Sequence, residues 1–321
     1  MLSSLLSNTT TALLLLPVAI FLSEERIFQA RFVLAIAYGA SIGGIMTPIG
    51  TPPNLILMGF LESQGLPSIA FVKWMFLTMP LAIVMLAIMP WVLSLGLPKE
   101  HGEFAIHGEK PRMTAEQRKL TWVLVLLGGL LLLNSRIEPW YPGLGMDDKM
   151  IMLGFGLLMF VPGMNFLSWE DTRRIPYEII FLFGAGFSIA GALVDSGLAQ
   201  VIAQSLEAFA QFHAFFLILV IAALITFSTE ITSNTALVSL AVPIIYSLGQ
   251  LAETSTVLIL MVATICGSYA FMLPIATPPN AIAMSSGALR VKEMMSLGLV
   301  FNLLGITLVT LTAWFFWRWF L

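Results

Sequence analysis

The sequence predicts an all-α integral membrane protein, an inverted-repeat structure with re-entrant helical hairpins and broken transmembrane helices. Its composition is the first observation behind this prediction. Hydrophobic residues make up 58% of the 321 residues and charged residues only 10%, whereas soluble domains carry about 25% charged residues. The other two observations are apolar runs of membrane-spanning length and a motif pair that occurs twice.

Residues 1–97 are predicted to form the first repeat. A short apolar run at 9–22 has the length of a re-entrant arm rather than a full span. A longer apolar region, 28–64, is interrupted by Gly and Pro, which predicts a broken helix. A complete span follows at 70–97.

Residues 98–118 are predicted to be a basic cytoplasmic loop. Cytoplasmic loops carry an excess of Lys and Arg, and this segment with its flank holds Lys99, Lys110, Arg112, Arg118 and Lys119. The predicted spans then bring more basic residues to the same side: Arg26, Arg31, Arg173, Arg174, Arg290 and Lys292. This asymmetry supports the span assignment, because one misplaced span would disturb it.

Residues 119–321 are predicted to form the second repeat. A hairpin is expected at 213–247, a broken helix at 256–289, and an interfacial amphipathic segment at 195–212. The complete spans expected in this region are 119–136, 150–166, 177–194 and 295–317.

Two motifs recur at a constant offset of 226 residues without any gap. The sequence Ser-Asn-Thr begins at Ser7 and again at Ser233, and the sequence Thr-Pro-Pro-Asn begins at Thr51 and again at Thr277. Each motif alone is weak, but two pairs with the same internal spacing indicate an internal repeat. Five predicted crossings separate the first arm from the second hairpin, so the repeats should be inverted. Inverted repeats with broken helices indicate a transport site near the midplane of the membrane.

The motif residues suit the binding of both cations and anions. Proline removes a backbone N–H, so carbonyl oxygens near Gly50 and Ala276 should be free to bind a hard cation such as Na⁺. Thr51 and Thr277 should be N-caps, with a proline at the first helical position. We further expect that the side chains of Asn8-Thr9 and Asn234-Thr235 can cap their helices and that their amides can donate to a substrate carboxylate.

These motifs resemble those of the divalent anion:sodium symporter family, which includes dicarboxylate, citrate and sulfate carriers. The resemblance is carried by SNT at 7–9, IGTPPN at 49–54, TEITSNTA at 229–236 and IATPPN at 275–280. It implies one Na⁺ site per repeat: Ser3, Ser7, Asn8 and Gly50 in the first, and Thr229, Thr232, Asn234 and Ala276 in the second. It also implies substrate-binding residues in both repeats: Asn8, Thr9, Asn234, Thr235 and Pro278.

The resemblance implies Na⁺-coupled symport of small divalent anions, most simply di- or tricarboxylates such as succinate, malate or citrate. It also implies a multi-pass homodimer in the cell membrane (the inner membrane of a bacterium), an elevator-like movement of the hairpins, and no nucleic-acid partner. Sulfate transport and proton coupling are the alternatives. No Ser/His pair, Asp pair or HExxH lies in the predicted spans, which argues against an intramembrane enzyme. A channel is disfavoured because two hairpins with closed tips suggest occluded access.

Two further expectations concern Glu230 and the beginning of the chain. Glu230 lies in the second hairpin turn, where it could tune a cation site or relay protons, although a hydrogen bond within the turn is the simpler interpretation. The offset of 226 places the incoming arm of the first hairpin before Met1. We therefore expect the first repeat to be N-terminally incomplete in this chain, and residues 1–321 alone to show no coupled uptake.

Overall fold

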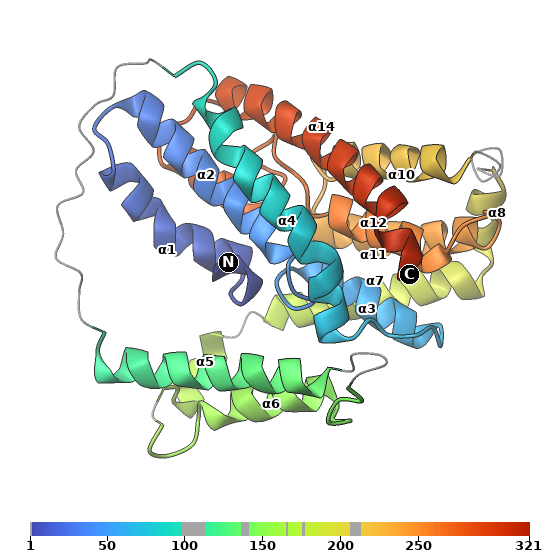
Figure 1. The fold of residues 1–321 in the computed structure, drawn as a ribbon, viewed down its shortest axis with the longest axis horizontal. Coiled ribbons are helices and arrows are strands. Elements are labelled where there is room, and N and C mark those ends of the chain that lie inside the picture. Colours follow the sequence, from blue (N-terminus) through green and yellow to red (C-terminus); the bar gives the residue numbers. More distant parts are fainter. Residues whose placement is uncertain (1, 98–112, 136–140, 165, 175–176, 206–212) are drawn as a thin grey trace. The chain divides into compact units, whose positions relative to one another are not determined.

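The protein is described here by a computed structural model, which covers residues 2–97, 113–135, 141–164, 166–174, 177–205 and 213–321. Every regular element in these ranges is a helix, in agreement with the predicted all-α class (Figure 1). Most of the predicted basic loop, with residues 98–112, lies outside the described residues.

The chain divides into two compact units. The first comprises Met1–Ser68, Leu77–Ile106 and Phe181–Leu321 and contains both copies of the two motifs. The second comprises Ile69–Phe76 and His107–Ile180. In this second unit α5 (Ala115–Asn134) packs against α6 (Asp148–Leu158), and the side chain of Asn134 hydrogen-bonds to the segment that leads into α6.

Three helices in the described residues are long and apolar enough to cross a membrane: Arg26–Gly44, Phe71–Ser94 and Val291–Trp319. The apolar helices of both predicted hairpin regions are shorter, 14 to 16 residues. The remaining predicted spans also contain helices, α5, α6 and α7 (Tyr177–Asp195). Short apolar helices beside full spans are the lengths expected for a bundle with re-entrant arms.

The first motif-bearing segment folds as a helix, a connection and a broken helix. α1 (Asn8–Phe21) is followed by α2 (Arg26–Gly44), which stops before α3 (Pro52–Ser63) begins. The predicted interruption of region 28–64 is therefore confirmed, at residues 45–51. α4 (Phe71–Ser94) then forms the predicted span.

The second motif-bearing segment repeats this order after one additional helix. α10 (Ala214–Ser228) and α11 (Asn234–Gly249) are the two helices in the region of the predicted hairpin. α12 (Thr256–Cys266) and α13 (Pro278–Ser285) are separated by residues 267–277, so region 256–289 is broken as predicted. α14 (Val291–Phe315) ends the unit as a long apolar helix.

The two segments pack against each other in a reciprocal way. α1 contacts its own α2 and also α13 of the second segment, while α11 contacts its own α12 and also α3 of the first. α2 contacts α13, and α12 contacts α3. Each helix that begins at a Ser-Asn-Thr motif, α1 or α11, thus lies against the helix that follows the break in the other segment.

One predicted boundary is wrong. The span expected at 150–166 is helical only to Leu158, after which the chain turns. Pro162 lacks an N–H for a helical hydrogen bond, and Gly163 has a φ of 100°, a conformation that favours glycine. This Pro-Gly pair explains why the helix does not extend to the end of the apolar run.

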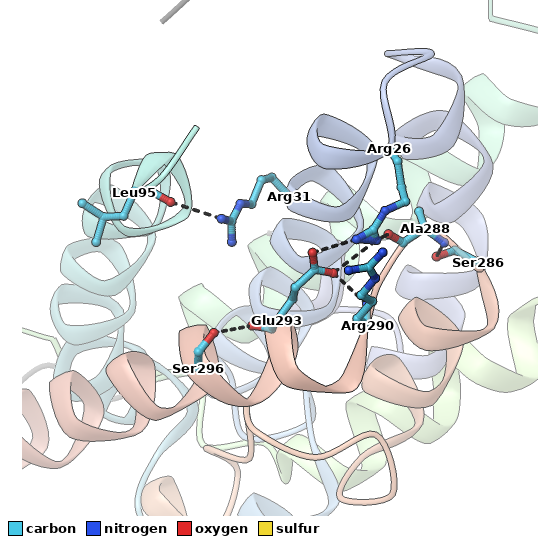
Figure 2. A network of polar contacts seen from close by, with 8 residues as sticks. All are labelled: Arg26, Arg31, Leu95, Ser286, Ala288, Arg290, Glu293 and Ser296. Atoms are coloured by element: carbon cyan, nitrogen blue, oxygen red, sulfur yellow. Dashed lines mark hydrogen bonds and ion pairs between the residues drawn. The ribbon is translucent and has the colours of Figure 1, made fainter. Parts of the chain in front are cut away.

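A polar network joins the start of α2 to the start of α14 (Figure 2). Arg26 donates to Glu293 at 2.8 Å and to the carbonyl of Ala288 at 2.9 Å. Glu293 also accepts from the backbone N–H of Arg290, which closes the N-terminal cap of α14. Since α2 and α14 belong to different motif-bearing segments, the network links the two.

Candidate functional site

Each helix break is held together by the asparagine of its Thr-Pro-Pro-Asn motif. Asn54 donates from Nδ2 to the carbonyls of Gly44 (3.2 Å) and Thr47 (2.8 Å). Asn280 donates in the same way to the carbonyls of Ala270 (2.9 Å) and Leu273 (3.0 Å). These partners also obey the offset of 226, so the two breaks share one local geometry.

Both asparagines are completely buried, and their carbonyl oxygens have no hydrogen-bond partner in the described part of the protein. The hydroxyl of Thr277 is likewise buried without a partner. Buried polar atoms are normally paired, so unpaired oxygens beside a break fit a site that binds a cation.

The threonines of these motifs occupy the predicted N-cap positions. Thr51 and Thr277 are extended, with φ/ψ of −147°/145° and −142°/150°, and prolines begin α3 and α13. Neither threonine side chain makes a capping hydrogen bond. The position was therefore predicted correctly, whereas the capping contact was not.

Gly50 allows the first break to be compact. A Cβ atom at this position would lie 2.3 Å from the carbonyl oxygen of Gly44, which is closer than real Cβ contacts allow. Gly44 in turn lies against Asn8, because a Cβ there would be 2.6 Å from Asn8 Oδ1. The break is thus in direct contact with the first Ser-Asn-Thr motif.

The two Ser-Asn-Thr turns are attached to the breaks by equivalent hydroxyl groups. Ser3 is buried, its hydroxyl donates to Asn8 Oδ1, and it lies 2.7 Å from the carbonyl of Ala40.

In the second segment Thr229 donates to Asn234 Oδ1 at 2.7 Å and lies 3.0 Å from the carbonyl of Gly267. Ser3 and Thr229 are again 226 residues apart. In both segments a hydroxyl therefore connects the motif asparagine to the end of the helix that precedes the break.

The predicted capping role of the motif asparagines is wrong. Ser7, one residue earlier, is the N-cap of α1 and accepts from the N–H of Thr10 at 3.1 Å, and Ser233 is the N-cap of α11. Asn8 and Asn234 are the first helical residues. Their side chains extend instead to the hydroxyls of Ser3 and Thr229. At the first motif Ser7 already accepts an N–H of the first turn, whereas the side chain of Ser233 makes no capping hydrogen bond.

Glu230 is the one buried carboxylate among the described residues. It accepts from three consecutive backbone N–H groups of the second break, at Phe271 (2.7 Å), Met272 (2.9 Å) and Leu273 (2.9 Å). Asn302 of α14 donates to it at 2.7 Å. A hydrogen bond within the turn was expected, but the carboxylate binds the neighbouring break.

The first segment also connects its turn to its helix break, but without a charged side chain. Ser4 stands at the position equivalent to Glu230, and its carbonyl accepts from the hydroxyl of Thr47. The carbonyl of Met46 is 3.3 Å from the hydroxyl of Thr78 on α4. The two segments therefore share their asparagine contacts and differ in the charge beside the break.

The structure brings some predicted site residues together and leaves others apart. Ser3, Asn8, Thr229 and Asn234 are joined to the breaks, as described above. Ser7 and Pro278 are exposed. The side chains of Thr9, which follows Asn8, and Thr232, two residues before Asn234, make no hydrogen bond in the described residues. Thr235 is buried near the start of α11, and its carbonyl accepts from Ser239.

Sequence reasoning missed the roles of three asparagines. Asn54 and Asn280 stood in the motif but received no function, and Asn302 was not considered. The repeated Asn at the end of Thr-Pro-Pro-Asn was a usable signal, because a buried amide after two prolines must find acceptors. Asn302 gave no such signal, since its contact joins positions 72 residues apart.

The chemistry of this region is neutral apart from Glu230. No cluster of three His, Cys, Asp or Glu that could hold a metal occurs in the described residues. The α1, α3, α11 and α13 helices all begin at the motifs. Their N-terminal N–H groups and dipoles favour anions without a buried Lys or Arg.

The structure has two broken helices, and hydrogen bonds join each break to the turn before a short apolar helix. Broken helices in repeated segments are typical of secondary transporters. A family model described as Citrate transporter matches residues 1–267. A sodium-dependent dicarboxylate transporter, SdcS, of Staphylococcus saprophyticus is 30% identical, over 98% of this chain and 66% of the relative. An uncharacterized transporter of Haemophilus influenzae is 32% identical, over 98% of this chain and 70% of the relative. SdcS of Staphylococcus aureus is 29% identical, over 66% of its length.

The chain therefore belongs to the citrate transporter family, and relatives named sodium-dependent dicarboxylate transporters agree with the resemblance that its motifs indicated. Members of this group are transporters rather than enzymes, and the chain is a multi-pass membrane protein. It spans about two thirds of the length of the SdcS relatives.

Proposed function

We propose that this protein takes part in Na⁺-coupled symport of small divalent anions, with di- or tricarboxylates such as succinate, malate or citrate as substrates. The observation that carries the proposal is the pair of equivalent helix breaks. In each, a motif asparagine and a hydroxyl, Asn8 with Ser3 or Asn234 with Thr229, contact the end of the helix before the break.

Each break offers one Na⁺ site in this proposal. The ligands would be the oxygens of the residues named from the motifs, Ser3, Ser7, Asn8 and the Gly50 backbone in one and Thr229, Thr232, Asn234 and the Ala276 backbone in the other. The buried unpaired oxygens of Asn54, Asn280 and Thr277 support the need for an additional positive partner at these places.

The substrate would bind between the sodium sites, at the helix N-termini. Asn8, Thr9, Asn234, Thr235 and Pro278 would face its carboxylates in this proposal. The reciprocal packing of α1 on α13 and of α11 on α3 supports this arrangement, because it brings starts of helices from both segments into one bundle. It also supports an inverted repeat with re-entrant hairpins, which would move as one body in an elevator-like cycle of a homodimer in the cell membrane.

Uptake of labelled succinate, citrate and sulfate into liposomes that contain a full-length version of the protein tests this function, since residues 1–321 alone are expected to show no coupled uptake. We expect succinate or citrate uptake that requires an inward Na⁺ gradient and is lost when choline replaces Na⁺. A second assay measures binding, as stabilisation of the detergent-solubilised protein by substrate with and without Na⁺, and does not require a complete transport cycle. Substrate binding that is indifferent to Na⁺ would contradict the proposal.

Proton coupling is the second candidate, and Glu230 is the observation that favours it, since it is a buried carboxylate beside a break. Its four hydrogen bonds favour a structural role instead, because they tie the carboxylate to the backbone of the second break and to Asn302. Uptake driven by a pH gradient in Na⁺-free buffer would favour this alternative, and uptake of sulfate in preference to carboxylates would change the substrate class.

A further inference from the structure

A cavity of about 580 Å³ lies at the end of the second hairpin away from its Ser-Asn-Thr turn. Three parts of the chain surround it. They are the start of α10 at His213, the connection from α11 to α12 at Leu251–Thr254, and the end of α14 at Trp314, followed by Arg318. Because the ends of apolar helices are expected at the surface of the bilayer, we place this cavity at the level of the lipid headgroups.

The cavity has a polar mouth and an apolar floor. His213, Glu253 and Arg318 are exposed, whereas Leu217 and Leu258 are buried. Its volume is in the range of small-molecule sites, which are about 300–1,000 Å³. An amphipathic ligand with a charged head and an apolar tail fits this gradient.

Arg318 is held in place at the mouth by aromatic rings. Its guanidinium carbon is 4.5 Å from the ring centroid of Trp314 and 4.7 Å from that of Trp319. Such stacking orients the planar guanidinium, whose N–H groups match the oxygens of a phosphate. Two tryptophans at a span end are also typical of the membrane interface.

The two charges of the cavity do not neutralise each other. Arg318 and Glu253 both line it, yet the ion pair recorded among the described residues is the one between Arg26 and Glu293. A cavity that presents a separate cation and a separate carboxylate complements a zwitterion that carries a phosphate and an ammonium group.

We propose that this cavity binds the headgroup of a phosphatidylethanolamine molecule from the surrounding bilayer. The phosphate would receive hydrogen bonds from Arg318, and the ammonium group would pair with Glu253. The first methylenes of the acyl chains would cover Leu217 and Leu258. This lipid site lies outside the motif residues and does not depend on the transported ion or substrate.

Native mass spectrometry of the purified, delipidated full chain tests the proposal. The protein is mixed with phosphatidylethanolamine, phosphatidylcholine or phosphatidylglycerol at equal concentration, and retained lipid is counted. We expect one phosphatidylethanolamine retained in preference to the others. Arg318→Gln should weaken its retention about tenfold, because a charge-assisted hydrogen bond is lost. Arg318→Lys should retain an intermediate amount, and Glu253→Gln should remove the preference over phosphatidylcholine.

Arg118→Gln, at an exposed arginine outside the cavity, is the matched control and should bind like the native protein. Equal losses in the Arg118 and Arg318 variants would overturn the proposal, as would preferential retention of phosphatidylglycerol. Binding of soluble phosphoethanolamine is measured as a final comparison. If it binds as tightly as the lipid, the ligand is a soluble zwitterion and the assignment to a membrane lipid is wrong.

Discussion

Asn8 and Asn234 are the side chains that connect the beginning of a hairpin arm to a broken helix. Replacement of either by alanine removes an amide that can serve ion and substrate, and leaves the hydroxyl of Ser3 or Thr229 without one acceptor. A buried group left unpaired costs about 1–3 kcal/mol, and more when its partner is charged. We expect Asn8→Ala and Asn234→Ala each to abolish Na⁺-dependent substrate binding and uptake.

Asn134→Ala provides the matched control for this prediction. Asn134 is a buried asparagine whose side chain is hydrogen-bonded, but it lies in the second compact unit and holds the approach to α6. This variant should lose stability while keeping its dependence on Na⁺. Near-normal substrate affinity in either motif variant would show that the site assignment is wrong.

Glu230 fixes the second break through its carboxylate. A glutamine at this position has one acceptor oxygen and places an amide N–H₂ among the N–H donors of Phe271 to Leu273. We expect Glu230→Gln to lower the apparent stability by on the order of 1–3 kcal/mol, to reduce uptake modestly, and to leave Na⁺ coupling intact.

Cys266 offers a direct measurement of this loss. It is the single cysteine of the chain and is buried in α12, so a thiol-reactive dye reports the opening of this region on heating. Asn302→Ala removes one of the four donors to Glu230 and should have a smaller effect. If transport by the Glu230→Gln variant instead became pH-independent exchange without Na⁺ coupling, this result would support the proton alternative.

The first break depends on the close approach of Gly50 to Gly44. Gly50→Ala would place a Cβ 2.3 Å from a backbone carbonyl oxygen, which cannot turn away as a flexible side chain can. Overpacking of this kind costs about 1–3 kcal/mol. We expect Gly50→Ala to lower stability and to weaken Na⁺ affinity more than substrate affinity at saturating Na⁺.

Gly128→Ala in α5 is the control for the glycine prediction, because nothing lies within 4 Å of its added Cβ. Alanine favours a helix over glycine by roughly 1 kcal/mol, so this variant should be as stable as the native protein or more stable. A Gly50→Ala protein with unchanged stability and Na⁺ affinity would show that the break can rearrange at no cost.

The positions of the helix breaks could be predicted from the sequence because they depend on local chemistry. Proline removes N–H groups wherever it stands, and the offset of 226 identified equivalent positions before any contact was known. The contacts could not be predicted in the same way. Glu230 binds residues about forty positions away, and its partner Asn302 is on a helix whose packing no local pattern reveals.

The boundary error in α6 and the wrong capping residues have a common cause. Hydropathy continues through Pro162 and Gly163, although hydrogen bonding and backbone conformation end the helix before them. Similarly, both serine and asparagine are good N-caps, so the Ser-Asn-Thr sequence did not show that Ser7 would cap and Asn8 would extend to Ser3. In both cases the local sequence was compatible with two structures, and the sequence pattern alone did not show which of them forms.

The Arg26–Glu293 pair links the two motif-bearing segments at the starts of α2 and α14 (Figure 2). Their side chains are 40% and 34% exposed, so solvent screens part of the attraction. A double-mutant cycle with Arg26→Gln and Glu293→Gln should give a coupling of about 0.5–1 kcal/mol in apparent unfolding free energy. Added salt should reduce it, and labelling of Cys266 on heating measures it.

Glu293→Gln alone should cost more than Arg26→Gln, because Glu293 also accepts from the backbone of Arg290 at 2.9 Å and thereby caps α14. A cycle with additive effects would show that the two segments are held together without this pair.

Two equivalent breaks in one compact unit predict that Na⁺ binds cooperatively with substrate. Each break supplies its own asparagine and hydroxyl oxygens, so uptake should rise with Na⁺ with a Hill coefficient clearly greater than one. Coupling between sites is reciprocal: if Na⁺ raises substrate affinity by some factor, substrate must raise Na⁺ affinity by the same factor. Equilibrium binding measured both ways, with labelled substrate and with ²²Na⁺, tests this equality. A Hill coefficient near one in both uptake and binding would leave one functional ion site, and the comparison of Asn8→Ala with Asn234→Ala would then identify the break that contains it.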